Sequence, residues 1–204
     1  RLASLSGGAL SETAIDMALA ASLRVPEGAT HYFAIASPLR TMPLLLTPGW
    51  NLVSLSLEPT DPNVASVLAE PVREGPARGK PVRGGGRGVV YSGSVWRWDT
   101  SQPGAGQYVI ASELHALTGY WVWVDQEWTV TVTGTVPAAT LTHLAQGWNL
   151  IGPAAPLPLP NQPAILGRVW WWDLERYWLA AELVTGKGYW FFAMDEDVQL
   201  ELGP

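Results

Sequence analysis

The stretch Gly147-Trp148-Asn149-Leu150-Ile151 decides how the chain is interpreted, because Gly49-Trp50-Asn51-Leu52-Val53 nearly repeats it. Three further blocks follow each copy in the same order. They are Val95 to Asp99, Tyr108 to Leu114 and Gly119-Tyr120-Trp121 after the first copy, and Val169 to Asp173, Tyr177 to Leu183 and Gly188-Tyr189-Trp190 after the second. The spacing from Tyr108 to Trp121 equals that from Tyr177 to Trp190. So long an ordered match of rare residues predicts a tandem repeat.

The composition favours short strands and many turns. The 204 residues include 12 Trp, 21 Gly and 17 Pro, and 15% are charged, whereas globular domains average roughly 25%. Trp128, Val130 and Val132 alternate with threonines, which is typical of a strand with one buried and one solvent-exposed face. Asp61-Pro62-Asn63 could start a short helix through Val64. The sequence predicts a mainly β protein of tandem, small sandwich-like or barrel-like units, each with at most a short helix.

The predicted organisation has three parts. A first full repeat covers residues 47–136 and contains a Gly/Arg-rich insertion at 70–93, and a second covers 137–204. Residues 1–46 are interpreted as a partial N-terminal repeat or docking segment, because Leu19 to Leu23 and His31-Tyr32-Phe33 match later blocks. The Gly-Trp-Asn strand and the Trp-rich strand have no counterpart there. An ordinary helix from Ser11 to Leu23 is the alternative.

Several classes of protein are disfavoured by composition. There is no Cys, and the three His residues are scattered, so neither a disulfide framework nor a zinc site is expected. A net charge of −6 argues against a general nucleic-acid binder. No apolar run approaches the ~20 residues that span a bilayer. We expect no cofactor, no metal, no nucleic-acid partner and no membrane span.

The sequence begins at Arg1, without a methionine or a signal peptide. We therefore expect the sequence to be a processed or excised part of a longer precursor.

No catalytic constellation is evident, and we expect no enzymatic activity. The carboxylates Asp99 and Asp173 recur in both repeats, as do Glu113 and Glu182, which favours capping of turns over a dyad of two differently tuned acids. The stretch 195–197, Asp-Glu-Asp, is interpreted as a hairpin turn because it lacks the glycine and distant glutamate of a calcium loop. The glycines at 84–86 are not followed by the Lys-Ser/Thr of a phosphate loop.

Tryptophan is the residue type abundant enough to carry a function, since indole faces stack on sugar rings and on protein hot spots. We interpret Trp50, Trp148, Trp121 and Trp190 as large plugs of the core. The candidate binding or interface surface consists of Trp96, Trp98, Trp123, Trp170, Trp171, Trp172 and Trp178. Within it Trp123, Trp171 and Trp178 are the better candidates for exposure, because the partner repeat has no Trp at their positions.

The insertion adds a second candidate surface, which is basic rather than aromatic. It could bind an anionic polymer or the acidic face of a neighbour through Arg78, Lys80, Arg83 and Arg87. A solvated loop is the favoured interpretation, because a long loop with few apolar residues buries too little surface to order itself.

The order Gly-Trp-Asn, Trp-rich strand and Gly-Tyr-Trp resembles the Gly-Trp-Asn modules that recur in large secreted and cell-surface proteins of bacteria and archaea. The resemblance covers residues 48–204 apart from the insertion. It implies an extracellular or cell-surface location and an accessory, adhesive or structural role, and it implies no activity. The expected function is therefore a non-enzymatic extracellular structural or adhesive protein. A carbohydrate-binding module with exposed Trp residues is the alternative, and a polysaccharide would then be the partner.

The incomplete N-terminal repeat leaves two sources for its missing strands. A neighbouring copy could donate them, with residues 1–10 as the docking segment, and head-to-tail contacts of this kind would build a filament or surface layer. The partners would then be other copies of the chain or other surface proteins. An upstream segment removed from this chain is the other source, and both remain open.

Overall fold

The computed structural model describes residues 38–70, 88–101 and 106–203, and the backbone of three strands nearer the N-terminus. The chain forms two compact units, Arg1–Leu39 and Arg40–Pro204. In the first unit β1 (Leu2–Ser6) lies between β2 (Ala9–Ile15) and β3 (Tyr32–Ile35) in an antiparallel sheet. A helix beginning at Ser11 is therefore wrong, since β2 is extended through Ile15. Both edges of β1 are paired within the chain, and residues 19–23 lie outside the described part.

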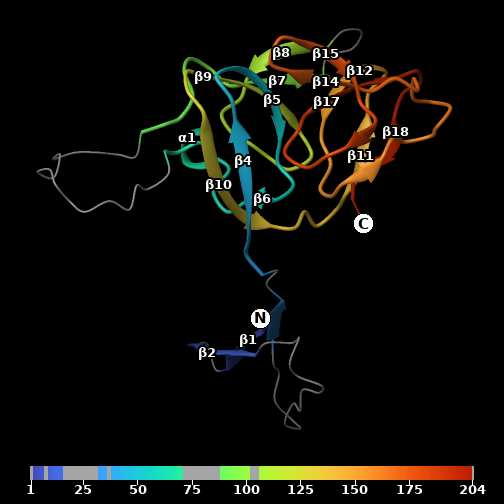
Figure 1. Ribbon diagram of the computed structural model, residues 1–204. Helices are drawn as coiled ribbons and strands as arrows, with labels where there is room; N and C mark the ends of the chain where they lie inside the picture. The colour runs from blue at the N-terminus through green and yellow to red at the C-terminus, as the bar shows by residue number, and fades with distance from the viewer. Residues whose placement is uncertain are drawn as a thin grey trace, which may run out of the picture. The chain divides into compact units, whose positions relative to one another are not determined.

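The described residues of the second unit are mainly β, as predicted, and include one short helix (Figure 1). The helix α1 (Val64–Val67) begins where the sequence predicted, with Asn63 Oδ1 accepting a hydrogen bond from the Ala65 N–H at 2.9 Å. The strands are β4 (Arg40–Leu46), β5 (Gly49–Ser54), β6 (Glu58–Pro59), β7 (Trp96–Asp99), β8 (Gln107–Ile110), β9 (Gly119–Val124), β10 (Trp128–Thr135), β11 (Leu141–Leu144), β12 (Gly147–Ile151), β13 (Leu157–Pro158), β14 (Trp170–Asp173), β15 (Arg176–Leu179), β16 (Glu182–Leu183), β17 (Tyr189–Ala193) and β18 (Val198–Glu201).

Two four-stranded antiparallel sheets dominate this unit. Sheet 1 has the strand order β5-β9-β7-β8, and sheet 2 has the order β12-β17-β14-β15. They lie next to one another, with β14 against β5 and with β12 against β7 and β9 (Figure 1). We call this contact the seam. Smaller sheets, β4-β10-β6, β11-β18 and β13-β16, complete the unit.

The boundary of the second unit differs from the one expected from the sequence. Residues 40–46 were assigned to the N-terminal segment, but β4 pairs with β10 along its whole length. The cause is the alternation of Met42, Leu44 and Leu46, which all point into the core. This pairing places β4 within the unit that contains both four-stranded sheets.

Backbone hydrogen bonds join the two ends of the predicted insertion at 70–93. The Glu70 N–H donates to the Gly88 carbonyl at 2.8 Å, and the Val90 N–H donates to the Leu68 carbonyl at 2.9 Å. Val90 is buried and Tyr91 packs against the first core, so this part of the expected insertion belongs to the core. The basic residues Arg78, Lys80, Arg83 and Arg87 lie outside the described residues.

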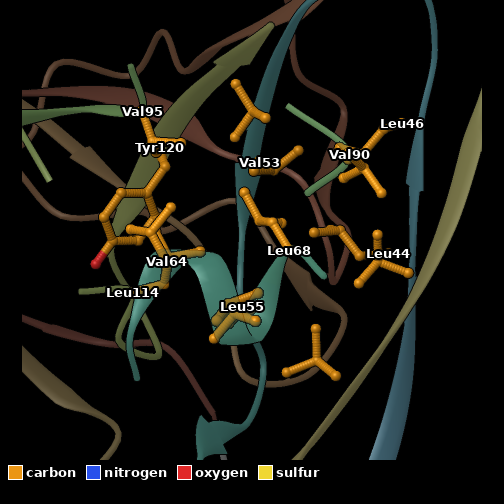
Figure 2. Packing of buried hydrophobic residues seen from close by; sticks show 14 of the residues in the cluster. Leu44, Leu46, Val53, Leu55, Val64, Leu68, Val90, Val95, Leu114 and Tyr120 are labelled. Carbon is orange, nitrogen blue, oxygen red and sulfur yellow. The ribbon is translucent and has the colours of Figure 1, made fainter. Parts of the chain in front are cut away.

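Each four-stranded sheet covers a separate hydrophobic core with the face turned away from the seam. In the first core, Tyr120 of β9 lies beside Val64 and Leu114 (Figure 2). In the second core, Tyr189 and Phe191 of β17 pack with the buried residues of β18. The two tyrosine hydroxyls accept hydrogen bonds from the N–H groups of His115 and Val184, at 2.9 and 2.8 Å.

The acidic stretch 195–197 connects two sheets and is not a hairpin turn. It leads from β17 in sheet 2 to β18, which pairs with β11. Asp197 has a φ of 54° and reverses the chain just before Val198. The predicted alternation of apolar residues and threonines is confirmed in β10, where Val130 and Val132 are buried and the threonines that alternate with them are exposed.

The asparagine of each Gly-Trp-Asn stretch holds the turn that leads into its strand. Asn51 Oδ1 accepts from the Thr47 N–H at 2.9 Å, and its Nδ2 donates to the Thr47 carbonyl at 2.8 Å. Asn149 makes the same two bonds with Ala145, at 3.0 and 2.7 Å. The glycines two positions earlier have φ values of 103° and 96°, which residues with a Cβ rarely adopt. These side chains therefore fix where β5 and β12 begin.

We predict that Asn51→Ala and Asn149→Ala each lower the free energy of unfolding by about 1–3 kcal/mol, because a partly buried backbone donor and acceptor lose their partner. Denaturant unfolding followed by tryptophan fluorescence measures the change. Asn161→Ala is the matched control, since Asn161 is exposed and no hydrogen bond in the described residues uses its side chain. Equal stability of all three variants would contradict this role.

Candidate functional site

The seam depends on two glycines that carry no side chain where the sheets meet. A Cβ on Gly119 would lie 2.5 Å from Leu150 Cγ, and one on Gly188 would lie 3.0 Å from Leu52 Cγ. The first distance is shorter than real Cβ contacts, and the second is tighter than nine in ten of them, so a Cβ on Gly188 would require Leu52 to move by a few tenths of an ångström. The missing side chains therefore let each leucine reach the opposite sheet. There Leu52 and Leu150 pack with Trp121 and Trp190 in a buried cluster.

Reciprocal hydrogen bonds join the sheets across the seam. Trp98 Nε1 of sheet 1 donates to the Trp148 carbonyl of sheet 2 at 2.8 Å. In the opposite direction, Trp172 Nε1 donates to the Trp50 carbonyl at 3.0 Å. The donors occupy matching positions in the Trp-rich strands, and the acceptors occupy matching positions in the Gly-Trp-Asn strands. The seam is therefore isologous: the same patch of each sheet meets its own counterpart.

Two aromatic clefts open where the sheets diverge from the seam. Cleft 1 has a volume of about 460 Å³ and cleft 2 of about 510 Å³, within the ~300–1,000 Å³ typical of ligand sites. Cleft 1 is lined by Trp50, Trp96, Tyr108, Trp121, Trp172 and Tyr177, and cleft 2 by Trp148, Trp170, Tyr177, Trp190, Trp98 and Tyr108. In this order the two sets correspond position by position. Tyr108 and Tyr177 line both clefts, so the clefts are adjacent.

Each cleft has a buried wall and an exposed rim. Trp121 and Trp190 are each 8% exposed, whereas the shared residues Tyr108 and Tyr177 are 47% and 42% exposed. The rings meet edge to face. Trp121 and Trp172 lie 5.4 Å apart at 75°, and their counterparts Trp190 and Trp98 lie 5.1 Å apart at 81°. These walls form shallow notches, open to solvent, against which a ring can pack, because neighbouring faces are nearly perpendicular.

The chemistry of the clefts is that of a binding site. Among the described residues, none of those that line either cleft carries a formal charge. Burial raises the pKa of Tyr108 and the pKa of Tyr177, so both hydroxyls stay protonated at neutral pH. The Trp121 indole N–H is buried near the Tyr108 hydroxyl and does not reach strict hydrogen-bonding geometry with any described residue. The lining can surround and hydrogen-bond a ligand, and it offers no general base.

The structure places the predicted tryptophans in two surroundings. Trp96, Trp98, Trp170 and Trp172 come together at the seam. The exposed Trp123 lies beside Trp50 at the start of β5, with ring centroids 5.5 Å apart.

Trp171 and Trp178 pair across β14 and β15 on the other face of sheet 2. Lys187 Nζ lies 3.7 Å from the Trp171 ring centroid, and Arg176 Cζ lies 3.9 Å from that of Trp178. These two tryptophans therefore do not join the clefts.

The interpretation of Trp50 and Trp148 as core plugs is wrong. They are 38% and 41% exposed, whereas Trp121 and Trp190 are buried as predicted. All four point toward the seam, but the seam covers only the middle of each sheet. Trp50 and Trp148 follow the turn glycines and lie beyond the covered area, where they line the open ends of the clefts.

The cleft residues Tyr108 and Tyr177 were not singled out as candidates. They do occupy matching positions of the similar sequence blocks that begin at residues 108 and 177, which is a usable signal. Their role depends on how β8 and β15 are placed relative to the opposite sheet, because both tyrosines line both clefts. The periodicity of a single strand does not predict this placement.

The recurrent carboxylates lie away from the clefts. Asp99 accepts hydrogen bonds from the Ser101 N–H and hydroxyl, which lower its pKa, so it caps a turn as expected. Glu113 contacts His115, whose other ring nitrogen lies 2.7 Å from Glu58 Oε1. No cluster of three or more His, Cys, Asp or Glu that could hold a metal occurs within the described residues. Nor does this part of the chain contain a helix long and apolar enough to cross a membrane.

Comparison with protein-family models, curated proteins and solved structures finds no significant match. Functional inference therefore rests on the geometry of the clefts and on the repeated sequence blocks.

We predict that Gly119→Ala and Gly188→Ala destabilise the seam, with a loss of about 1–3 kcal/mol in the free energy of unfolding, as in overpacked cores. The new methyl group would collide with Leu150 or Leu52. Gly167→Ala is the control, because a Cβ there meets nothing within 4 Å. Thermal unfolding checks the order of stability. Variants at 119 and 188 that unfold at the temperature of the control would show that the sheets do not approach so closely.

Proposed function

We propose that the protein is a non-enzymatic binding module of adhesive type that holds its ligand in the two aromatic clefts. The observation that carries this proposal is the matched pair of clefts, each lined by six aromatic rings and open at the rim. Large exposed aromatic surface is unfavourable in water, so an apolar notch of this size is typical of a binding site. The absence of charge from the cleft lining among the described residues favours binding over acid–base chemistry.

The proposal includes a tandem repeat of one small β unit. It is supported by the corresponding strand orders β5-β9-β7-β8 and β12-β17-β14-β15 and by the reciprocal bonds of Trp98 and Trp172. Duplication of a unit with a self-complementary face would generate such a seam. The resemblance to Gly-Trp-Asn modules supports an extracellular or cell-surface location as part of the same proposal.

A carbohydrate-binding role is a second candidate, for which the exposure of Trp50 and Trp123 is the supporting observation, whereas the angle between their rings argues against it. Their indoles meet at 74° and therefore do not form a flat stacking platform for a sugar. A structural role through self-assembly is supported by a different feature. The edge strands β8 and β15 expose Ile110 and Leu179, and exposed apolar edges are templates for pairing with another chain.

We predict that two molecules of a small neutral aromatic, such as fluorobenzene, bind per chain. Titration followed by ¹⁹F NMR measures the stoichiometry. Trp50→Ala should remove the site in cleft 1, and Trp148→Ala the site in cleft 2, because each indole lines one cleft only.

Trp178→Ala is the control for this titration, since Trp178 is 41% exposed and lines neither cleft. Near-ultraviolet circular dichroism checks that each variant keeps its fold. Binding that is absent, or that survives in the double variant of Trp50 and Trp148, would rule out the clefts as the binding site.

A further inference from the structure

We infer that the partner of the clefts is an uncharged, proline-rich segment of another protein, bound in an extended polyproline conformation across both clefts. This inference rests on the proposed binding function and names the class of partner. Four features of the clefts lead to it: their electrical neutrality, the hydrogen-bonding character of their polar atoms, the angle between their rings, and their adjacency.

The clefts suit a neutral ligand. Within the described residues, every side chain that lines them is Trp or Tyr. A charged group bound there would lose its hydration without gaining an ion pair, which is costly. Charge complementarity therefore disfavours acidic glycans and charged peptides.

The polar atoms of the walls are mainly donors. An indole N–H can donate a hydrogen bond but cannot accept one, and no acidic or amide side chain lines either cleft in the described part of the chain. The N–H groups of Trp96 in cleft 1 and Trp170 in cleft 2 make no hydrogen bond within the described residues. Sugars present many hydroxyl donors, for which these walls provide few acceptors beyond the two tyrosine hydroxyls.

A proline-rich segment has the complementary pattern. Each proline presents a carbonyl acceptor and no N–H donor, and the polyproline conformation leaves its carbonyls free of internal hydrogen bonds. Its pyrrolidine rings are compact and apolar, so they fit notches between perpendicular rings better than a flat platform. Aromatic grooves are a recurring means of binding such segments.

The adjacency of the clefts favours one continuous ligand. Tyr108 and Tyr177 line both clefts, so a segment that leaves cleft 1 enters cleft 2 beside the same two hydroxyls. A polyproline segment is already extended and stiff before binding, which reduces the entropy lost in spanning two sites. Occupation of the second cleft then becomes an intramolecular step with a high effective concentration.

The test uses the full chain and isothermal titration calorimetry with a ten-residue polyproline peptide. We expect one peptide to bind per chain. Trp50→Ala or Trp148→Ala should weaken binding by about tenfold or more, as for aromatic residues at the centre of interfaces. The control Trp178→Ala should leave the affinity unchanged. A peptide of the same length made of Gly and Ser should not bind.

Two results would overturn the inference. One is a lack of polyproline binding by a protein that still binds fluorobenzene at both clefts, in which case the proposed function stands and the partner class is wrong. The other is binding of a soluble neutral β-glucan that is lost in the Trp50 and Trp148 variants while polyproline does not bind, which would identify a carbohydrate site. Failure of fluorobenzene itself to bind would overturn the proposed function as well.

Discussion

The close approach of the two four-stranded sheets at Gly119 and Gly188 is the constraint on which the rest of the second unit depends. Each glycine leaves room for a leucine of the opposite sheet, and any Cβ would displace Leu150 or Leu52. This approach brings Trp98 Nε1 and Trp172 Nε1 within hydrogen-bonding distance of backbone carbonyls on the other side. A tryptophan that is hydrogen-bonded in this way is held in one orientation, so the ring positions around the seam are defined.

The clefts are a geometric consequence of this seam. Flat contact between two twisted sheets is limited in extent, because strand twist separates the sheets away from the contact. The central rings Trp121 and Trp190 are buried, whereas Trp50 and Trp148 protrude beyond the contact. Aromatic residues at the margin therefore remain accessible. Because the contacts across the seam are reciprocal, two clefts form, and each is lined by residues of both sheets.

The positions of several strands along the chain were predictable from the sequence. The two Gly-Trp-Asn stretches predict β5 and β12, the alternation of residues 128–133 predicts β10, and Asn63 predicts the start of α1. The sequence does not predict how much of each sheet face is covered by other parts of the chain. Alternation assigns Trp50 and Leu52 to one face, but both faces of sheet 1 pack against other parts of the chain, so periodicity does not separate a core from a seam. The assignment of β4 likewise depends on its distant pairing with β10.

The most direct test of the account is hydrogen exchange at the individual indole N–H groups, measured by ¹H–¹⁵N NMR on the intact chain. The account predicts slow exchange at Trp98 and Trp172, whose N–H groups are bonded across the seam. Trp178, exposed on another face, should exchange rapidly. If the N–H groups of Trp98 and Trp172 exchanged as fast as that of Trp178, the reciprocal seam, and with it the pair of clefts, would be contradicted.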